Sequence, residues 1–204
     1  DLAAVHDAEK GNKAAGPAMT AREVPSRRLA ILFAALCALG IAVSVELTRI
    51  HVFVHTDPEY HSICAMGEGV NCETVAVSPY SVFAGLPGSV GGIAGYLLMG
   101  VLAVWAASRR RFHPTWPLGL LLLLTIFSAA TSAVVAFISA TRIDSLCLFC
   151  TGSYAVTAAL LALSILAVRR SSAPVLHLLV LDLRALAARP PLAVLLALLA
   201  LLAL

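Results

Sequence analysis

The hydrophobic residues of this chain fall in long, nearly uninterrupted blocks that are separated by polar segments. Four of these blocks hold almost no charged side chain, the exception being Glu46 near the end of the first. A helix of about 20 residues is about 30 Å long, which matches the hydrocarbon core of a bilayer. The pattern therefore predicts four membrane-spanning helices, at residues 29–47, 89–107, 117–140 and 146–168.

Three further segments lie outside the four blocks and outside the polar loop at residues 48–88. Residues 1–28 are polar and lack a periodic apolar pattern, so we expect a disordered tail. In residues 171–189, leucines and valines recur at helical spacing against polar side chains, which predicts an amphipathic helix in the membrane interface. Residues 192–204 are apolar but short for a span. They form either a truncated fifth helix or a hydrophobic chain end.

Composition agrees with a membrane protein. Hydrophobic residues make up 60% of the chain, charged residues only 12%, and the mean hydropathy is +0.94. A soluble domain carries about twice that share of charge. No basic stripe interleaved with aromatic residues is present, so nucleic acid is not an expected partner. We expect an all-α membrane protein with a tail at 1–28, a four-helix domain at 29–168, and a C-terminal part at 169–204.

The basic residues predict how the chain is oriented in its membrane. With four spans, all of the 14 lysines and arginines except Arg49 and Arg142 fall on one side. Basic residues concentrate on the cytoplasmic side of membrane proteins, so the N-terminus is predicted to be cytoplasmic. The polar loop at residues 48–88 then lies outside the cytoplasm.

Four of the five cysteines fall on that extracytoplasmic side. Cys64 and Cys72 lie in the polar loop, and Cys147 and Cys150 form a C-x-x-C at the start of the fourth helix. Disulfides persist on this side of a bacterial membrane, and a helix N-terminus favours the reactive thiolate. A redox relay is the favoured interpretation. The simpler interpretations are that Cys64 and Cys72 only staple the loop and that Cys147 and Cys150 form a structural disulfide. Cys37, inside the first span, is expected to be a packing residue.

A zinc site is a further possibility for this loop, because histidines precede the loop cysteines. His51, His55 and His61 all lie before Cys64. Structural zinc sites have closer and more regular ligand spacing than this, so no metal is expected. His51 and His55 would share a helix face if the first helix extended that far, but interfacial polar residues are the preferred interpretation.

Together these motifs resemble the vitamin K epoxide reductase (VKOR) family in its bacterial form. The resemblance covers roughly residues 36–168 and includes two loop cysteines, a serine six residues after the second, and a C-x-x-C followed by Tyr154. Glu46 departs from the family pattern, which often has an aromatic residue there. The segments that carry the resemblance are 40–48, 70–75, 78–87, 91–96 and 146–150.

The resemblance implies a four-helix bundle around a quinone, with the loop capping the pocket. Residues 78–83 would form a short half-helix over the C-x-x-C. By the family pattern, Cys147 and Cys150 form the redox centre, with Cys150 facing the quinone. Cys72 would exchange with Cys147, and Cys64 would complete the pair that meets the partner.

The resemblance also implies the electron acceptor and the partner. The acceptor would be menaquinone or ubiquinone, and the donor a separate thioredoxin-fold (DsbA-like) protein outside the bacterial inner membrane. Ser78, Phe83 and Tyr154 are candidates for quinone binding, since a hydroxyl donor stabilises charge on a quinone oxygen. The simpler roles are a helix N-cap for Ser78 and an interfacial anchor for Tyr154.

Two alternatives to a quinone-dependent thiol oxidase remain open at this point. The first is reduction of vitamin K or its epoxide, as in the animal enzymes. The second is a membrane scaffold without activity, in which the cysteines only staple the loop. The sequence leaves open which quinone is used and which cysteine pair is oxidised at rest.

Overall fold

The computed structural model describes residues 27–65, 69–83, 85–108, 117–143, 145–171 and 174–188, together with Val194 and Ala197. The predicted tail lies outside these residues apart from its last two positions, which are already helical. The predicted fifth helix at 192–204 also lies outside them, apart from the two isolated positions.

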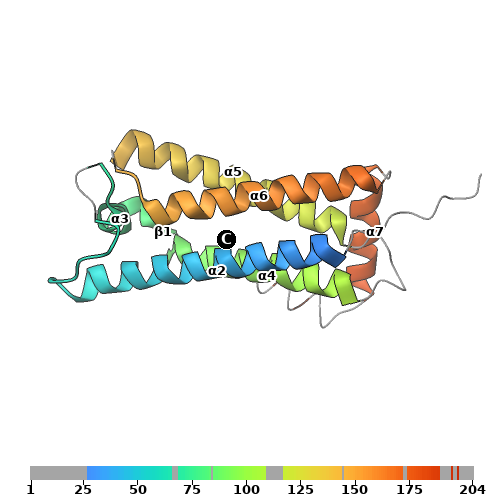
Figure 1. The fold of residues 1–204 in the computed structure, drawn as a ribbon, viewed down its shortest axis with the longest axis horizontal. Helices are drawn as coiled ribbons and strands as arrows, with labels where there is room; N and C mark the ends of the chain where they lie inside the picture. Colours follow the sequence, from blue (N-terminus) through green and yellow to red (C-terminus); the bar gives the residue numbers. More distant parts are fainter. Residues whose placement is uncertain are drawn as a thin grey trace, which may run out of the picture.

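Four long helices form the body of the protein, and short elements occupy the loop between the first two (Figure 1). The long helices are α2 (Arg27–Thr56), α4 (Gly88–Ser108), α5 (Leu118–Ile138) and α6 (Leu148–Arg170). The short elements are helix α3 (Cys72–Ala76), the 3-10 turn η1 (Pro79–Ser81), and strands β1 (Val82–Phe83) and β2 (Leu86–Pro87). A π-helical turn, η2 (Ser139–Ile143), continues α5, and α7 (Val175–Ala187) follows α6.

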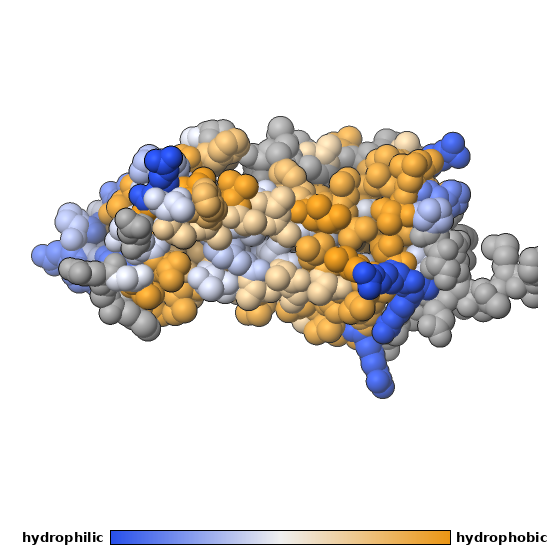
Figure 2. Space-filling view, turned by 90° about the horizontal axis from the view of Figure 1, so that it is seen from above, coloured by the Kyte–Doolittle hydropathy of each residue, from blue (hydrophilic) through white to orange (hydrophobic). Residues whose placement is uncertain are grey.

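The long helices confirm the predicted all-α membrane fold. Helix α2 packs mainly against α4 and α6, and α5 packs against α6. Three of the four are long and apolar enough to cross a membrane, and in α4 the described apolar stretch, Gly88–Val104, is shorter. Apolar side chains cover much of the side of the bundle, while polar residues gather toward its two ends (Figure 2).

Helix α2 is longer than its hydrophobic block. The predicted span ended at residue 47, whereas the helix continues to Thr56. His51 and His55 therefore do share a helix face: the ring of His55 contacts the carbonyl oxygen of His51 at 2.7 Å, and the two rings lie 4.5 Å apart. Hydropathy marks the part of a helix that fits a membrane, and a helix can continue beyond it with polar residues on its exposed side.

Small residues bring α2 and α4 close together. A Cβ atom on Gly40 would lie 2.7 Å from the ring of Tyr96, so the ring packs directly on the backbone of α2. The Tyr96 hydroxyl contacts the hydroxyls of Ser153 and Thr157 on α6 at 2.9 and 2.8 Å. One buried tyrosine thus connects three of the four long helices.

Helix α7 crosses the end of the bundle opposite the loop (Figure 1). Its Asp182 is buried and accepts a hydrogen bond of 3.0 Å from the backbone N–H of Leu120, in the first turn of α5. Burial raises the pKa of this carboxyl to about 6, although amide hydrogen bonds from Leu120 and Gly119 act in the opposite direction. A helix therefore exists where the amphipathic one was predicted, and its buried side, with Leu178 and Asp182, packs against the bundle.

The segment that was predicted as a half-helix has a different structure. Only Pro79–Ser81 form a single 3-10 turn, and the chain then makes the antiparallel pair β1–β2. Gly85, with φ 85°, provides the left-handed backbone that the tight turn requires. The helix in this loop is α3, which begins at Cys72 itself.

Candidate redox site

The two loop cysteines form a disulfide whose position is set by the start of α3. The Cα atoms of Cys64 and Cys72 lie 5.8 Å apart. Asn71 caps α3, because its side-chain oxygen accepts hydrogen bonds from the N–H groups of Glu73 and Thr74 at 2.8 and 3.3 Å. As the first residue of the helix, Cys72 is turned inward and is 2% exposed.

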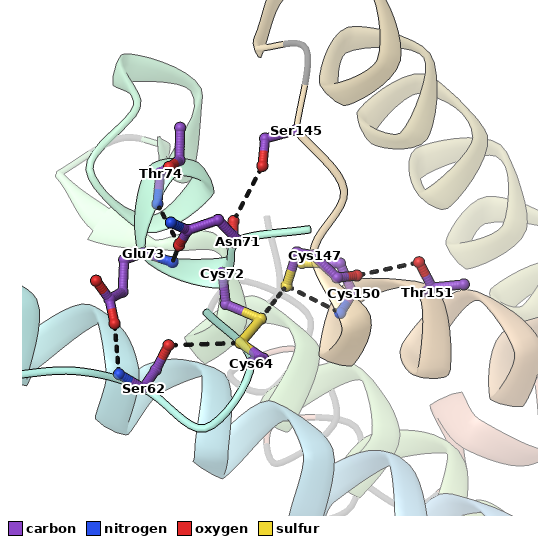
Figure 3. The surroundings of a disulfide bond; sticks show 10 residues. All are labelled: Ser62, Cys64, Asn71, Cys72, Glu73, Thr74, Ser145, Cys147, Cys150 and Thr151. Atoms are coloured by element: carbon purple, nitrogen blue, oxygen red, sulfur yellow. Dashed lines mark hydrogen bonds between the residues drawn. A yellow bond between two sulfur atoms is a disulfide. The ribbon is translucent and has the colours of Figure 1, made fainter. Parts of the chain in front are cut away.

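A short parallel pairing between two distant segments brings the disulfide to the C-x-x-C. The N–H of Asn71 donates to the carbonyl of Leu146 at 3.0 Å, and the N–H of Leu146 donates to the carbonyl of Gly69 at 3.1 Å. The next residue on each segment is a cysteine. The Sγ atoms of Cys72 and Cys147 consequently lie 3.3 Å apart (Figure 3).

Two buried serines hold this pairing in place. The hydroxyl of Ser145 donates to the carbonyl of Asn71 at 3.3 Å (Figure 3), and the hydroxyl of Ser139 donates to the carbonyl of Ser145 at 2.9 Å. The sequence analysis singled out neither serine. Both lie in stretches without a motif, so their role emerges only once the two segments are paired in space.

Cys147 occupies the N-cap of α6, and its sulfur is surrounded by donors. The N–H of Cys150 donates to the Cys147 sulfur at 3.2 Å. Hydrogen bonds from the Cys150 thiol and from the amides of Cys150 and Phe149 lower the pKa of Cys147 below its ordinary value, even though burial opposes this. Cys147 is therefore the more readily ionised thiol of the C-x-x-C, and a better leaving group in thiol–disulfide exchange.

An apolar shell surrounds the four sulfur atoms. Cys64, Cys72 and Cys147 form one buried cluster with Ile50 of α2, and Cys150 packs against it. The other side chains packed against the cluster are Leu47, Tyr60, Val75, Ala76 and Phe149. Helix α3 therefore supplies the cover that the sequence analysis had assigned to residues 78–83. That expectation was wrong, because the α-helix starts at the asparagine cap and ends before Ser78.

The three candidate quinone-binding residues differ in their surroundings. Ser78 occupies the N-cap position of η1 without capping it, since its hydroxyl donates back to the carbonyl of Val75 at 2.8 Å. Phe83 is 70% exposed on the β1–β2 pair. Tyr154 lies one helical turn beyond Cys150, and its hydroxyl is buried without a hydrogen-bond partner among the described residues. Their roles in quinone binding stay predictions.

The unpaired hydroxyl of Tyr154 is the feature that fits a quinone. A buried polar atom without a partner costs about 1–3 kcal/mol, so such atoms are uncommon unless a ligand satisfies them. A quinone carries carbonyl oxygens that accept hydrogen bonds. Residues four apart on a helix share a face, so an acceptor bound to Tyr154 would lie on the side of α6 that carries Cys150.

The described residues contain no group of three or more His, Cys, Asp or Glu side chains that could hold a metal ion. The rings of His51, which is half-buried, and His55, which is exposed, contact each other on α2. Cys37 is a free, buried thiol in α2 that packs near Gly100 of α4. Its position is that of an apolar packing residue.

A membrane-spanning helical bundle, in which a loop disulfide touches the thiol of a helix-capping C-x-x-C, defines a membrane-embedded thiol oxidoreductase. Comparison with known protein families matches residues 31–165 to the vitamin K epoxide reductase family, and the chain belongs to this family. A search of curated proteins found no match. The protein is accordingly an oxidoreductase of the membrane, with a quinone-related redox role.

Proposed function

We propose that this protein oxidises a thioredoxin-fold (DsbA-like) protein outside the cytoplasm and passes the electrons to a membrane quinone, menaquinone or ubiquinone. The product would be a disulfide in the partner, which we take to be a separate chain. The observation that carries the proposal is the 3.3 Å between the sulfurs of Cys72 and Cys147. Reacting atoms at about 3–3.5 Å are close enough for bond exchange without further rearrangement.

Each transfer step follows from the residues at the site. A dithiol partner reduces the Cys64–Cys72 disulfide by exchange. The Cys72 thiolate then attacks Cys147 in an oxidised C-x-x-C, the Cys147–Cys150 bond breaks, and Cys150 takes a proton. Cys64 attacks Cys72 in the mixed disulfide and releases Cys147. The amide of Cys150, which donates a hydrogen bond to the Cys147 sulfur, stabilises the Cys147 thiolate and so favours its release.

The last step moves the electrons out of the protein. A bound quinone accepts two electrons and two protons, and Cys147 and Cys150 become a disulfide. Tyr154 would donate its unpaired hydroxyl to a quinone oxygen and so hold the acceptor on the Cys150 side of α6. In the structure Cys64 and Cys72 form a disulfide, which can accept two electrons, and Cys147 and Cys150 are free thiols, which can donate two.

The charge distribution supports the proposed orientation in a bacterial cytoplasmic membrane. The exposed arginines Arg28, Arg169, Arg170 and Arg184 lie on elements that meet at the α7 end of the bundle, opposite α3 and the start of α6 (Figure 1). Basic residues favour the cytoplasmic side, so the redox cysteines would face outward. That side is oxidising in bacteria and holds the proteins that need disulfides.

The test is a quinone-reduction assay with the whole chain in lipid nanodiscs, comparing a reduced DsbA-like protein with chemically pre-reduced enzyme as electron source. Cys147→Ser and Cys150→Ser should abolish quinone reduction from both sources. Cys64→Ser and Cys72→Ser should block delivery from the protein but leave the pre-reduced C-x-x-C able to reduce quinone. The proposal is wrong if all four variants match the parent in both assays.

A further inference from the structure

The loop disulfide is shielded from any thiol in solution. Cys64 has no exposed surface and Cys72 is 2% exposed. Attack on Cys64 requires direct contact between two sulfur atoms, so part of its cover must move before a partner can react. The cover next to Cys64 includes Ser62, whose hydroxyl lies 3.6 Å from the Cys64 sulfur.

Glu73 holds this part of the cover closed. Its carboxylate accepts a hydrogen bond from the backbone N–H of Ser62 (Figure 3). The second carboxylate oxygen lies 4.0 Å from Nδ1 of His61. Glu73 directly follows Cys72, while His61 and Ser62 precede Cys64. The carboxylate therefore ties together the two chain segments that flank the disulfide.

The placement of Glu73 makes this contact stronger than an ordinary surface interaction. Its side chain is only 20% exposed, whereas the His61 side chain is 85% exposed. A hydrogen bond from an amide to a carboxylate is charge-assisted, and partial burial limits competition from water. The amide contact to Ser62 thus contributes more than the solvated contact to His61.

We propose that Glu73 is a positioning residue that latches residues 61–62 over the Cys64–Cys72 disulfide, and that a substrate thiol reaches Cys64 only when this latch opens. The inference rests on the proposed function and adds selectivity to it. Small thiols react slowly with the disulfide, because the latched segment covers Cys64. A protein thiol gains binding energy from its wider contact surface, and that energy can displace the latched segment.

Once the latch is open, the Cys64–Cys72 disulfide reacts with the partner by thiol–disulfide exchange. The partner's thiolate attacks the Cys64 sulfur, the bond from Cys64 to Cys72 breaks, and Cys72 leaves as a thiolate that takes up a proton. The partner's second thiol attacks the mixed disulfide and releases Cys64 as a thiol. The partner loses two electrons and gains a disulfide, and the loop pair gains both electrons.

The test measures how fast dithiothreitol reduces the loop disulfide in the full chain, without quinone. All proteins carry Cys147→Ser and Cys150→Ser, so that the loop pair is the disulfide followed by alkylation and mass spectrometry. Glu73→Ala should speed reduction roughly tenfold, the factor expected from one charge-assisted hydrogen bond. Glu73→Gln keeps an oxygen for the Ser62 amide but loses the charge assistance, so its rate should lie between those of the parent and Glu73→Ala. Glu59→Ala removes an exposed carboxylate from the same loop and should change nothing.

Two outcomes overturn the latch. The first is reduction of Glu73→Ala at the parent rate. The second is equal acceleration by Glu73→Gln and Glu73→Ala, which would assign the effect to charge rather than to the hydrogen bond. If Glu73→Ala fails to fold, Ser62→Pro removes the donor N–H from the other side and must accelerate reduction in its place. Because this assay contains no quinone, its result is separate from that of the quinone-reduction assay.

Discussion

At the residue scale, the sulfur of Cys147 is the point where the two halves of the site meet. It lies 3.3 Å from the Cys72 sulfur and accepts a hydrogen bond from the amide of Cys150. Both contacts depend on backbone positions, the N-cap of α6 and the pairing of Asn71 with Leu146. The reactive geometry is therefore built into the backbone rather than left to flexible side chains.

The unpaired hydroxyl of Tyr154 leads to a prediction at this scale. Tyr154→Phe should raise the KM for quinone about tenfold, because the variant lacks the donor to the quinone oxygen. Stability should be unchanged or slightly higher, because the substitution removes a buried hydroxyl that has no hydrogen-bond partner among the described residues. Steady-state quinone titration and a thermal unfolding curve measure the two effects.

The matched control is Tyr80→Phe, which removes a hydroxyl from a tyrosine that is 54% exposed on η1. It should leave both the KM and the unfolding temperature at the parent values. An unchanged KM in Tyr154→Phe would remove this residue from the quinone site.

The sequence predicted these reactive residues but not the ones that position them. The C-x-x-C and the loop cysteines stand out in the sequence because each motif is local, and their roles and that of Tyr154 were inferred with the help of the family resemblance. Ser145 and the latch contact of Glu73 could not, because each depends on a partner that the fold brings close from elsewhere in the chain.

At the scale of elements, each long helix corresponds to a hydrophobic block, but the ends differ. Hydropathy predicted α4 to within one residue at each end, while α2 runs nine residues past its predicted end at residue 47. The short elements were predicted less well. A 3-10 turn and a strand pair replace the expected half-helix, because pairing of Val82–Phe83 with Leu86–Pro87 satisfies the backbone there.

Contact between α2 and α4 leads to a second prediction. Gly40→Ala places a Cβ atom 2.7 Å from the ring of Tyr96, which itself is held by Ser153 and Thr157. Overpacking of this kind costs about 1–3 kcal/mol, so the unfolding temperature in nanodiscs should fall. Displacement of Tyr96 should also disturb α6 and slow quinone reduction.

Gly95→Ala provides the comparison on α4 itself. A Cβ atom at this position meets nothing within 4 Å, so the substitution should not destabilise the protein and should add about 0.5–1 kcal/mol, because alanine favours a helix over glycine. Equal effects of the two alanine substitutions would contradict the close approach of α2 to the Tyr96 ring.

At the scale of the whole molecule, the bundle separates two environments. The loop disulfide, the C-x-x-C and the latch lie together at one end, and α7 closes the other (Figure 1). The apolar sides offer a surface for lipid (Figure 2), from which a quinone can approach α6. Passage of electrons from a soluble thiol to a lipid-borne acceptor requires such an arrangement, because neither substrate enters the other's solvent.

The measurement that tests this account most directly is an anaerobic single turnover. Fully reduced protein is mixed with one equivalent of a quinone, quenched at intervals, alkylated, and analysed for each disulfide by peptide mass spectrometry. We expect the Cys147–Cys150 disulfide to appear first, in step with quinone reduction. The Cys64–Cys72 disulfide should then form while the Cys147–Cys150 disulfide disappears. Formation of the loop disulfide first, or no reduction of the quinone by the intact protein, would contradict the relay.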